Sequence, residues 1–305
     1  MKIDPLFHPE WVKFNERQWS LKSERLVFYP DKGASWKLEI VVYRNKRGQL
    51  VHPRRNPYLP VHFESTSNRQ SSYNRRKRLA LEKLALYFSK NQFGSSLSLS
   101  PVVDDMRPFI WQRMSVDPKY TYNIELSHYK SNCDANVINK INKARRIGYY
   151  CESTKDYKTV MECINQTELR KNLKHNLDND NFKQFYECTG QKMVELFLCR
   201  NSNGHPKAGR ICIYIPDGKS IGWLVGINSE ALKDGASALL NEYTLNYLYT
   251  KGCKIFDYHG GDVHSLATWK ETWGGALTLY FSISQINLKY SIIQVSNIVK
   301  NLIKR

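Results

Sequence analysis

The stretch KIFDYHGGDVHSLATWKETWGG, residues Lys254–Gly275, indicates more about fold and function than any other part of the chain. Its first half predicts a buried strand, because Ile255, Phe256 and Tyr258 belong to residue types that favour β structure. The pair Gly260-Gly261 then ends the strand at a turn, or where the backbone closely approaches another group.

A short helix is predicted to follow, over residues 265–273. Helical spacing places Leu266, Trp269 and Trp273 on one stripe, with Lys270 at its flank. An ammonium held against aromatic surface meets a phosphate or carbonyl oxygen with less competition from water. The alternative is that Lys270 extends along the apolar surface to solvent, as most lysines at a helix flank do.

Composition predicts a folded protein with an anionic partner. The 305 residues are 41% hydrophobic and 12% aromatic, and they suffice for two domains or one large one. Lys and Arg number 46 against 28 Asp and Glu, which leaves a net charge of +18. Such a balance favours RNA, a nucleotide-linked donor or an acidic membrane surface, and does not choose among them.

Several classes of protein are disfavoured by local patterns. The start, MKIDPLFHPEWVKF, lacks the apolar core of a signal peptide, and no segment approaches the ~20 apolar residues of a membrane span. We therefore expect a cytoplasmic protein. The seven Cys form no C-x-x-C pair and the eight His no H-x-x-x-H pair, so we expect reduced thiols and no metal site.

Periodicity and turn residues predict a mixed series of helices and strands. The expected helices are His8–Ser20, Ser72–Lys90, Asp104–Met114 broken at Pro108, one that starts after Ser127 or Asp134 and ends at Arg146, Asp156–Leu173, Ala236–Gly252 and Tyr290–Arg305. The expected strands are Trp36–Tyr43, one beginning at Leu50, Ser95–Pro101, Tyr120–Leu126, Met193–Cys199, Gly209–Ile215 and Ile221–Ile227.

Two basic clusters are candidates for binding a phosphate-bearing ligand. The proline-rich segment HPRRNPYLPVHF predicts an extended loop with Arg54 and Arg55 beside Tyr58, although a packed connector with solvated arginines fits equally well. Arg145 and Arg146 end a predicted helix, where cations are favourable for the helix itself.

A third candidate is the turn DGAS, which contains Gly235, Ala236 and Ser237. A strand, a turn of small residues and a helix N-terminus together bind an anion through free backbone amides. The alternative is that the turn only caps the helix.

The order of the motifs resembles the tandem acetyltransferase-fold proteins of the Fem-type peptidyltransferase group, and within it the CelD-like branch. The resemblance covers most of the chain and rests on NPYLP, YTYNIELS before a helix ending NKARRIGY, DGASALL, IFDYHGG and WKETWGG. The group shows an acidic strand residue before a glycine pair, then an aromatic-Lys pair before an aromatic-Gly. These positions fall on Asp257, Gly260, Gly261, Trp269, Lys270, Trp273 and Gly274.

The resemblance implies an α/β (α+β) fold of two acyl-CoA N-acyltransferase (GNAT-like) halves, each a mixed central sheet flanked by helices. We place the halves at residues 1–126 and 127–305, with the motif-bearing site in the second. The implied reaction moves an acyl or aminoacyl group from acyl-CoA, another thioester or aminoacyl-tRNA to an amine, with no tightly bound cofactor. The implied acceptor is a cell-envelope or polysaccharide precursor.

One departure from simple acetyltransferases bears on the donor. Their pyrophosphate cradle has Arg or Gln, two residues, Gly, one residue and then Gly or Ala. The nearest frame here is Lys233, Ala236 and Ala238, which puts acetyl-CoA in doubt.

Attack by a neutral amine on an ester or thioester requires a base and stabilisation of the oxyanion. Lys270 is the candidate for holding that oxygen or an anionic ligand group, and Asp257, His259 and His264 are the candidate bases. Each base has an alternative: Asp257 caps a turn or pairs with a cation, His259 packs near the glycines, and His264 is exposed. The expected binding residues are Arg54, Arg55, Arg145, Arg146, Gly235, Ala236, Ser237, Tyr258, Gly260, Gly261 and Trp269.

The competing hypothesis is a basic protein that binds RNA or a nucleotide-linked ligand on the same scaffold without catalysis. The final segment, residues 290–305, is expected to pack on its domain, with peripheral contact to an anionic membrane as the alternative. Oligomeric state is not predicted.

Overall fold

The computed structural model describes residues 4–172, 177–189 and 192–286. The described chain forms two compact units, one of residues 4–18 with 120–278 and one of residues 19–119 with 279–286. Two long strands, β6 (Met114–Glu125) and β12 (Ala276–Gln285), each run from one unit into the other. The sequence-based division at residue 126 lies near the crossing at 119/120. It does not anticipate that residues 4–18 belong to the unit of the later residues, or that residues 279–286 belong to the unit of the earlier ones. The two GNAT-like halves stay a prediction.

The unit that carries the glycine-pair motif is built on a mixed sheet. In spatial order its strands are β6, β11 (Ile255–Asp257), β10 (Lys219–Ile227), β9 (Pro206–Tyr214), β8 (Val194–Arg200) and β7 (Tyr150–Thr154). Neighbouring strands pair antiparallel, except that β10 and β11 are parallel. A parallel pair needs a crossover connection, and the helix after β10 supplies it.

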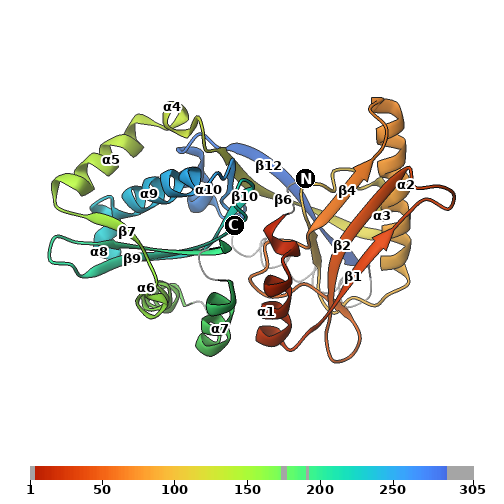
Figure 1. Ribbon diagram of the computed structural model, residues 1–305, viewed down its shortest axis with the longest axis horizontal. Coiled ribbons are helices and arrows are strands. Elements are labelled where there is room, and N and C mark those ends of the chain that lie inside the picture. The colour runs from red at the N-terminus through yellow and green to blue at the C-terminus, as the bar shows by residue number, and fades with distance from the viewer. Residues whose placement is uncertain (1–3, 173–176, 190–191, 287–305) are drawn as a thin grey trace, which may run out of the picture. The chain divides into compact units, whose positions relative to one another are not determined.

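Helices cover both faces of this sheet (Figure 1). The helices of the unit are α1 (Pro9–Trp19), α4 (Tyr129–Asn132), α5 (Ala135–Arg146), α6 (Tyr157–Arg170), α7 (Asn179–Thr189), α8 (Ser229–Lys233), α9 (Ala236–Thr250) and α10 (His264–Glu271), preceded by a 3-10 turn (Pro5–Phe7). α5 and α9 lie on one side of β7 to β9, with α6 and α7 on the other. Trp11 and Phe14 of α1 pack against Phe185 of α7 and Trp223 of β10.

The other unit has a smaller sheet and one long helix. Its elements are β1 (Lys22–Phe28), β2 (Trp36–Arg44), β3 (Leu50–Val51), β4 (Val61–Ser65), α2 (Gln70–Ser89), β5 (Leu97–Leu99) and α3 (Arg107–Trp111). β2 pairs antiparallel with β1, β3 and β4, while β5 pairs with the final part of β12. Leu81, Leu84 and Phe88 of α2 are buried, whereas its first turns are basic and partly exposed.

The expected fold class is confirmed as a mixed sheet flanked by helices, and most of the expected elements are present. The helix expected at residues 104–114 is not broken at Pro108. It is shorter, and Pro108 lies in its first turn, where a missing amide hydrogen costs nothing. The proline-rich segment is not extended loop throughout, since β4 forms after Pro60. The expected helix at residues 290–305 and Leu173 lie outside the described residues.

Candidate active site at the end of strand β11

Asp257 is the last residue of β11 and is fully buried. One of its oxygens accepts hydrogen bonds from Thr121 Oγ1 at 2.6 Å and from the His259 amide at 2.9 Å. The other oxygen lies 2.8 Å from Nζ of Lys219, at the start of β10. Three elements of the sheet therefore meet at this carboxylate.

These contacts fix the protonation state of Asp257. Burial alone would raise the pKa of the carboxyl, but the charge of Lys219 and the hydrogen bonds from Lys219, Thr121 and the His259 amide hold it below the ordinary value. The group is therefore an anion at neutral pH. A carboxylate with a depressed pKa is a weak base, so the structure favours the alternative interpretation of Asp257 as a residue that pairs with a cation and fixes a turn.

Lys270 does not reach solvent, because only 6% of the residue is exposed. It lies in the last turn of α10, and its Nζ donates to the main-chain oxygens of Tyr258 at 3.2 Å, of His259 at 2.9 Å and of Gly260. These three acceptors use all three hydrogens of an ammonium. The interpretation of Lys270 as a solvent-reaching flank residue is therefore wrong, and its observed role is to hold the turn after β11.

Burial sets the charge state of Lys270. Desolvation lowers the pKa of the amine to about 8, Asp257 opposes this shift, and the positive charge of Arg210 adds to it. The pKa of this amine therefore lies about 2.5 units below the ordinary lysine value of 10.5. Trp273 is buried as expected, but Leu266 is 41% exposed, so the predicted apolar stripe is only partly buried.

The turn between β11 and α10 has an unusual backbone. His259 has φ of +48° and Gly260 has φ of +79°. A side chain at Gly260 would meet nothing within 4 Å, whereas one at Gly261 would lie 3.0 Å from the Tyr120 oxygen. A side chain at residue 261 would therefore make a tight contact with β6, which favours glycine there. His259 is half-buried, and His264 is exposed at the start of α10, as its alternative interpretation anticipated.

A second buried polar chain lies on the α9 side of the sheet. Arg210 of β9 donates to the Asn241 side chain of α9, and Asn241 donates to the Tyr258 hydroxyl. Burial raises the pKa of the Tyr258 phenol. The Trp269 ring lies 5.6 Å from that of Tyr258, in an edge-to-face arrangement.

The parallel strands β10 and β11 pair over the whole length of the short strand β11. They pair at three positions, the last being Ile221 with Asp257, and β10 continues to Ile227. The ladder between β10 and β9 shifts register between Gly222 and Leu224. The Phe256 ring lies over Gly222, where a Cβ would come within 2.7 Å of its Cζ. The irregularity in β10 therefore lies directly beside the end of β11.

Comparisons with known proteins bear on this arrangement. No protein-family model and no curated protein matches the sequence. Solved structures do match: FemX at 12% identity, with a TM-score of 0.63 and 92% of each chain covered. The chain has the fold of the Fem-type group.

Two further structures share the Fem-type fold. L-PGS from Bacillus licheniformis matches at 14% identity with a TM-score of 0.53, covering 97% of this chain and 98% of that one. The C-terminal domain of a putative lysylphosphatidylglycerol synthetase from Agrobacterium fabrum matches at 8% identity with a TM-score of 0.55, covering 90% and 88%. These likenesses confirm the fold that the resemblance to the Fem-type group predicts.

In this Fem-type fold the DGAS turn is packed against α5. Gly235 has φ of +85°, and a Cβ there would lie 2.3 Å from the Lys140 oxygen. Lys143 also reaches over from α5 and donates to the Lys233 oxygen at 2.8 Å. Gly235 and Ala236 are buried, and Ser237 is partly exposed. Helix packing accounts for the small residues of this turn.

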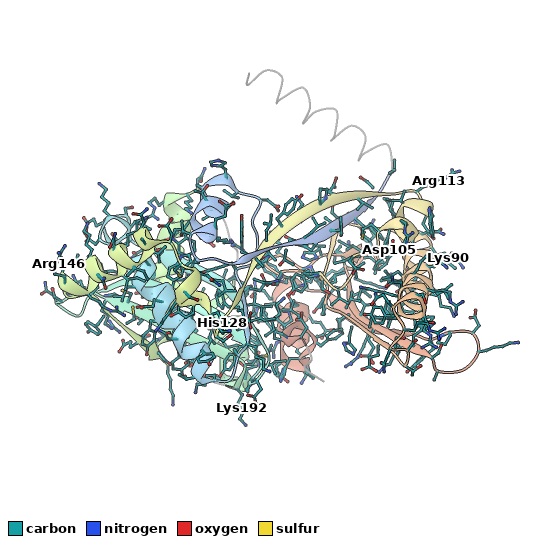
Figure 2. The ribbon with its side chains drawn as sticks, turned by 90° about the horizontal axis from the view of Figure 1, so that it is seen from above. Lys90, Asp105, Arg113, His128, Arg146 and Lys192 are labelled. Carbon is teal, nitrogen blue, oxygen red and sulfur yellow. The ribbon has the colours of Figure 1, made fainter. Side chains whose placement is uncertain are left out.

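The remaining basic candidates are not gathered at the turn after β11. Arg145 pairs with Glu242 of α9, and Arg146 lies exposed at the end of α5 (Figure 2). Arg54 is exposed and Arg55 has φ of +62°, both in the other unit of the Fem-type fold. Tyr58 is 1% exposed and offers no ring face to a ligand.

The residues that sequence reasoning missed are Lys219, Thr121, Arg210 and Asn241. Arg210 had a usable signal, since a charged residue inside the apolar strand GRICIYI is expected to have a dedicated partner. Lys219 had no such signal, because PDGK was interpreted as a turn.

No helix of residues 4–172, 177–189 and 192–286 is long and apolar enough to cross a membrane.

Proposed function

We propose that the protein is an N-acyltransferase that moves an aminoacyl or acyl group from an activated ester to an amine. The observation that carries the proposal is the Fem-type fold over 92% of the chain, together with a buried Asp-Lys turn at the position of the group's motifs. Proteins named FemX and lysylphosphatidylglycerol synthetase share that fold. The proposed acceptor is the amine of a cell-envelope or polysaccharide precursor.

Between the two donor classes, the features of the chain favour aminoacyl-tRNA over acyl-CoA. A CoA pyrophosphate of the simple acetyltransferase type would rest on the turn before α9, and here Lys140 and Lys143 of α5 pack on that turn. The net charge of +18 suits a polyanionic donor. The donor is a substrate of the proposed reaction, and no resident cofactor is invoked.

In the proposed mechanism the buried groups position the turn rather than exchange protons themselves. Lys270 holds the oxygens of Tyr258, His259 and Gly260, and Asp257 holds the His259 amide. This arrangement presents the half-buried imidazole of His259 as the base for the attacking amine. Lys270 would contact a ligand only by releasing one of its three carbonyl partners.

The test supplies the purified protein with aminoacyl-tRNA carrying radiolabelled amino acids and with a small-molecule extract of the cells that produce it. Transfer converts a base-labile ester into a base-stable amide, so label that survives mild alkali measures the reaction. We expect His259→Gln to lower the rate by about 10²–10⁴-fold with the fold intact. The exposed His264→Gln serves as the matched control and should leave the rate unchanged.

Separate titrations with acyl-CoA and aminoacyl-tRNA at two salt concentrations distinguish the donors. Saturable acyl-CoA binding with no tRNA-dependent transfer would contradict aminoacyl-tRNA as the donor. It would remain consistent with an N-acyltransferase. No base-stable label with either donor would contradict the reaction class.

The non-catalytic alternative is favoured by one observation, that the hydrogens of Lys270 and the oxygens of Asp257 are already engaged by the protein. A protein of that kind would bind RNA with steep salt dependence, and His259→Gln would not change the affinity. Measuring tRNA affinity and transfer on the same variant separates the two functions.

A further inference from the structure

The unit of residues 19–119 and 279–286 contains a cavity of about 790 Å³. Its walls come from the end of α1, the β2–β3 hairpin, residues 92–96 and the end of β12. The volume is within the range of small-molecule sites. None of the motifs that carry the Fem-type resemblance contributes to it, and neither does the turn after β11.

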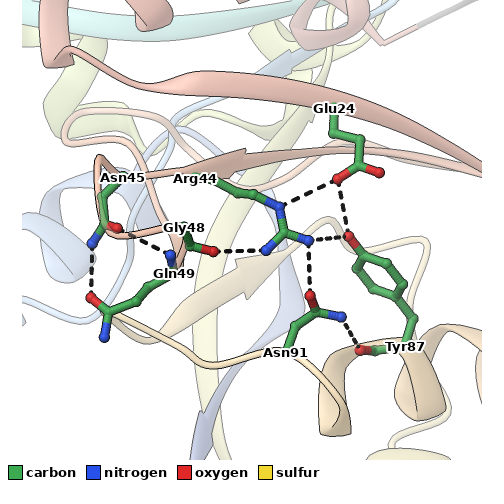
Figure 3. Close-up of polar contacts among 7 residues, drawn as sticks. All are labelled: Glu24, Arg44, Asn45, Gly48, Gln49, Tyr87 and Asn91. Atoms are coloured by element: carbon green, nitrogen blue, oxygen red, sulfur yellow. Dashed lines mark hydrogen bonds and ion pairs between the residues drawn. The ribbon is translucent and has the colours of Figure 1, made fainter.

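The hairpin that forms one wall is clamped by Arg44 (Figure 3). The Arg44 guanidinium donates to the Gly48 oxygen at 2.8 Å, to the Tyr87 hydroxyl at 2.7 Å and to the Asn91 side chain at 2.9 Å. It also pairs with Glu24 of β1 at 3.4 Å. One side chain thus joins the hairpin to a strand and to the end of α2.

Two amide side chains complete the framework. Asn45 Oδ1 accepts the amides of Arg47 and Gln49, and Asn45 Nδ2 donates to the Gln49 side-chain oxygen at 3.0 Å. Gln285 of β12 accepts the Phe93 amide at 3.0 Å and donates to the Asn91 oxygen at 2.8 Å. Both loops are therefore held in place before any ligand arrives, which lowers the entropy cost of binding.

The functional groups on this framework are largely unengaged. Lys46 and Arg47 are exposed at the hairpin tip, and neither has an ion-pair partner among the described residues. Within the same described part of the chain, the Gln92 side chain and the Gln49 Nε2 have no hydrogen-bond partner. The cavity thus presents two cations and two amide groups that can donate to or accept from a ligand.

Aromatic surface completes the lining. Trp19 and Phe93 are both partly exposed and line the cavity. Trp19 Nε1 is shielded from solvent and has no hydrogen-bond partner in the described chain, although an indole donor normally has one.

We propose that this cavity binds an anionic saccharide. Sugar rings present apolar faces to Trp19 and Phe93, and their hydroxyls both donate and accept, as the Gln49 and Gln92 amides do. A carboxylate or phosphate on the sugar would meet Lys46 and Arg47. A polynucleotide is the poorer fit, because two cations at one rim do not track a phosphate backbone. The site does not depend on the proposed transfer reaction.

Calorimetric titration of the full chain tests this site. The ligands are trigalacturonic acid, its neutral methyl ester and glucose 1-phosphate, which distinguish a carboxylate from a phosphate as the anionic group. We expect saturable binding of at least one acidic ligand, weakened about tenfold or more when Lys46→Ala and Arg47→Ala are combined. Gln92→Ala should weaken the same ligand severalfold. The exposed Arg75→Ala, on α2 and outside the cavity, is the matched control.

The outcomes separate a saccharide site from general attraction to a basic protein. Equal affinity for the acid and its methyl ester, or an equal loss in Arg75→Ala, would overturn the proposal. Loss in the charge variant with no loss in Gln92→Ala would overturn it as well, because only the charge would then be recognised. Absence of saturable binding by both acidic ligands has the same consequence.

Discussion

At the scale of single residues, the turn after β11 lies beside three cationic side chains and one carboxylate. Lys219 is neutralised by Asp257, while Lys270 and Arg210 have main-chain or amide acceptors in place of a carboxylate. The lysine responds by losing basicity, and an arginine cannot do so. The charge of Lys270 is therefore the component of this cluster that pH can change.

Lys270 predicts a specific pH dependence of stability. Its pKa is about 8 in the folded chain against 10.5 for the model lysine, so between these values the unfolded state binds more protons. Stability should therefore rise with pH in this window, by up to about 3 kcal/mol relative to Lys270→Met, which lacks the group. Urea unfolding from pH 7 to pH 10 measures this difference. The exposed Lys254→Met should follow the natural chain, and parallel curves for Lys270→Met would contradict the prediction.

The sequence predicts those parts of this cluster in which the contacting residues lie close together along the chain. The motif IFDYHGG correctly predicts a buried strand that ends in a glycine turn, because this signal is local. The partners of Asp257 are not local, since Thr121 is 136 residues away in the chain and Lys219 lies on a separate strand. Register between strands decides those contacts, and one sequence does not contain the register.

At the scale of elements, the same reasoning explains which helices and strands are predictable. Gly235 and Gly252 flank α9, so the local sequence alone predicts where this helix begins and ends. α7 (Asn179–Thr189) begins after Asp178, whose side chain accepts the Asn181 amide, and tertiary contacts of Phe182 with β10 and of Phe185 with α1 stabilise it further. β4 was hidden by the prolines that precede it, and pairing with β2 determines it.

The contact between α5 and α9 gives an element-scale prediction at Gly235. Gly235→Ala forces a left-handed φ on alanine and drives Cβ toward the Lys140 oxygen, so we expect a loss of about 2–4 kcal/mol. Gly33→Ala has a similar φ of +71° with nothing within 4 Å, and isolates the backbone cost of about 1 kcal/mol. Thermal and urea unfolding compare the two. Equal losses of unfolding free energy in the two variants would show that α5 moves away from the added Cβ at no energetic cost, which would contradict the prediction.

At the scale of the whole molecule, the chain passes between its units through β6 and β12, and its first helix belongs with the later residues. Trp11 of α1 lies 5.6 Å from Phe185 and 5.1 Å from Trp223. Three residues of β6, Asn123 to Glu125, pair with all of β11. The unit that holds the candidate site is therefore assembled from distant segments, although its motifs are contiguous.

This topology predicts that residues 127–305 will not fold alone, even though they contain every residue of the turn after β11. The fragment lacks Thr121, the β6 partner of β11 and the aromatic contacts of α1, so Asp257 loses a hydrogen bond and β11 becomes an edge. Joining residues 1–18 to 120–278 through a long Gly/Ser linker restores all of these and should give a cooperative unfolding transition. Near-UV circular dichroism and urea unfolding compare the two chains. Cooperative unfolding of 127–305 by itself would instead favour the sequential halves suggested by the motif order, and would place the stabilising contacts of the site entirely within the second half.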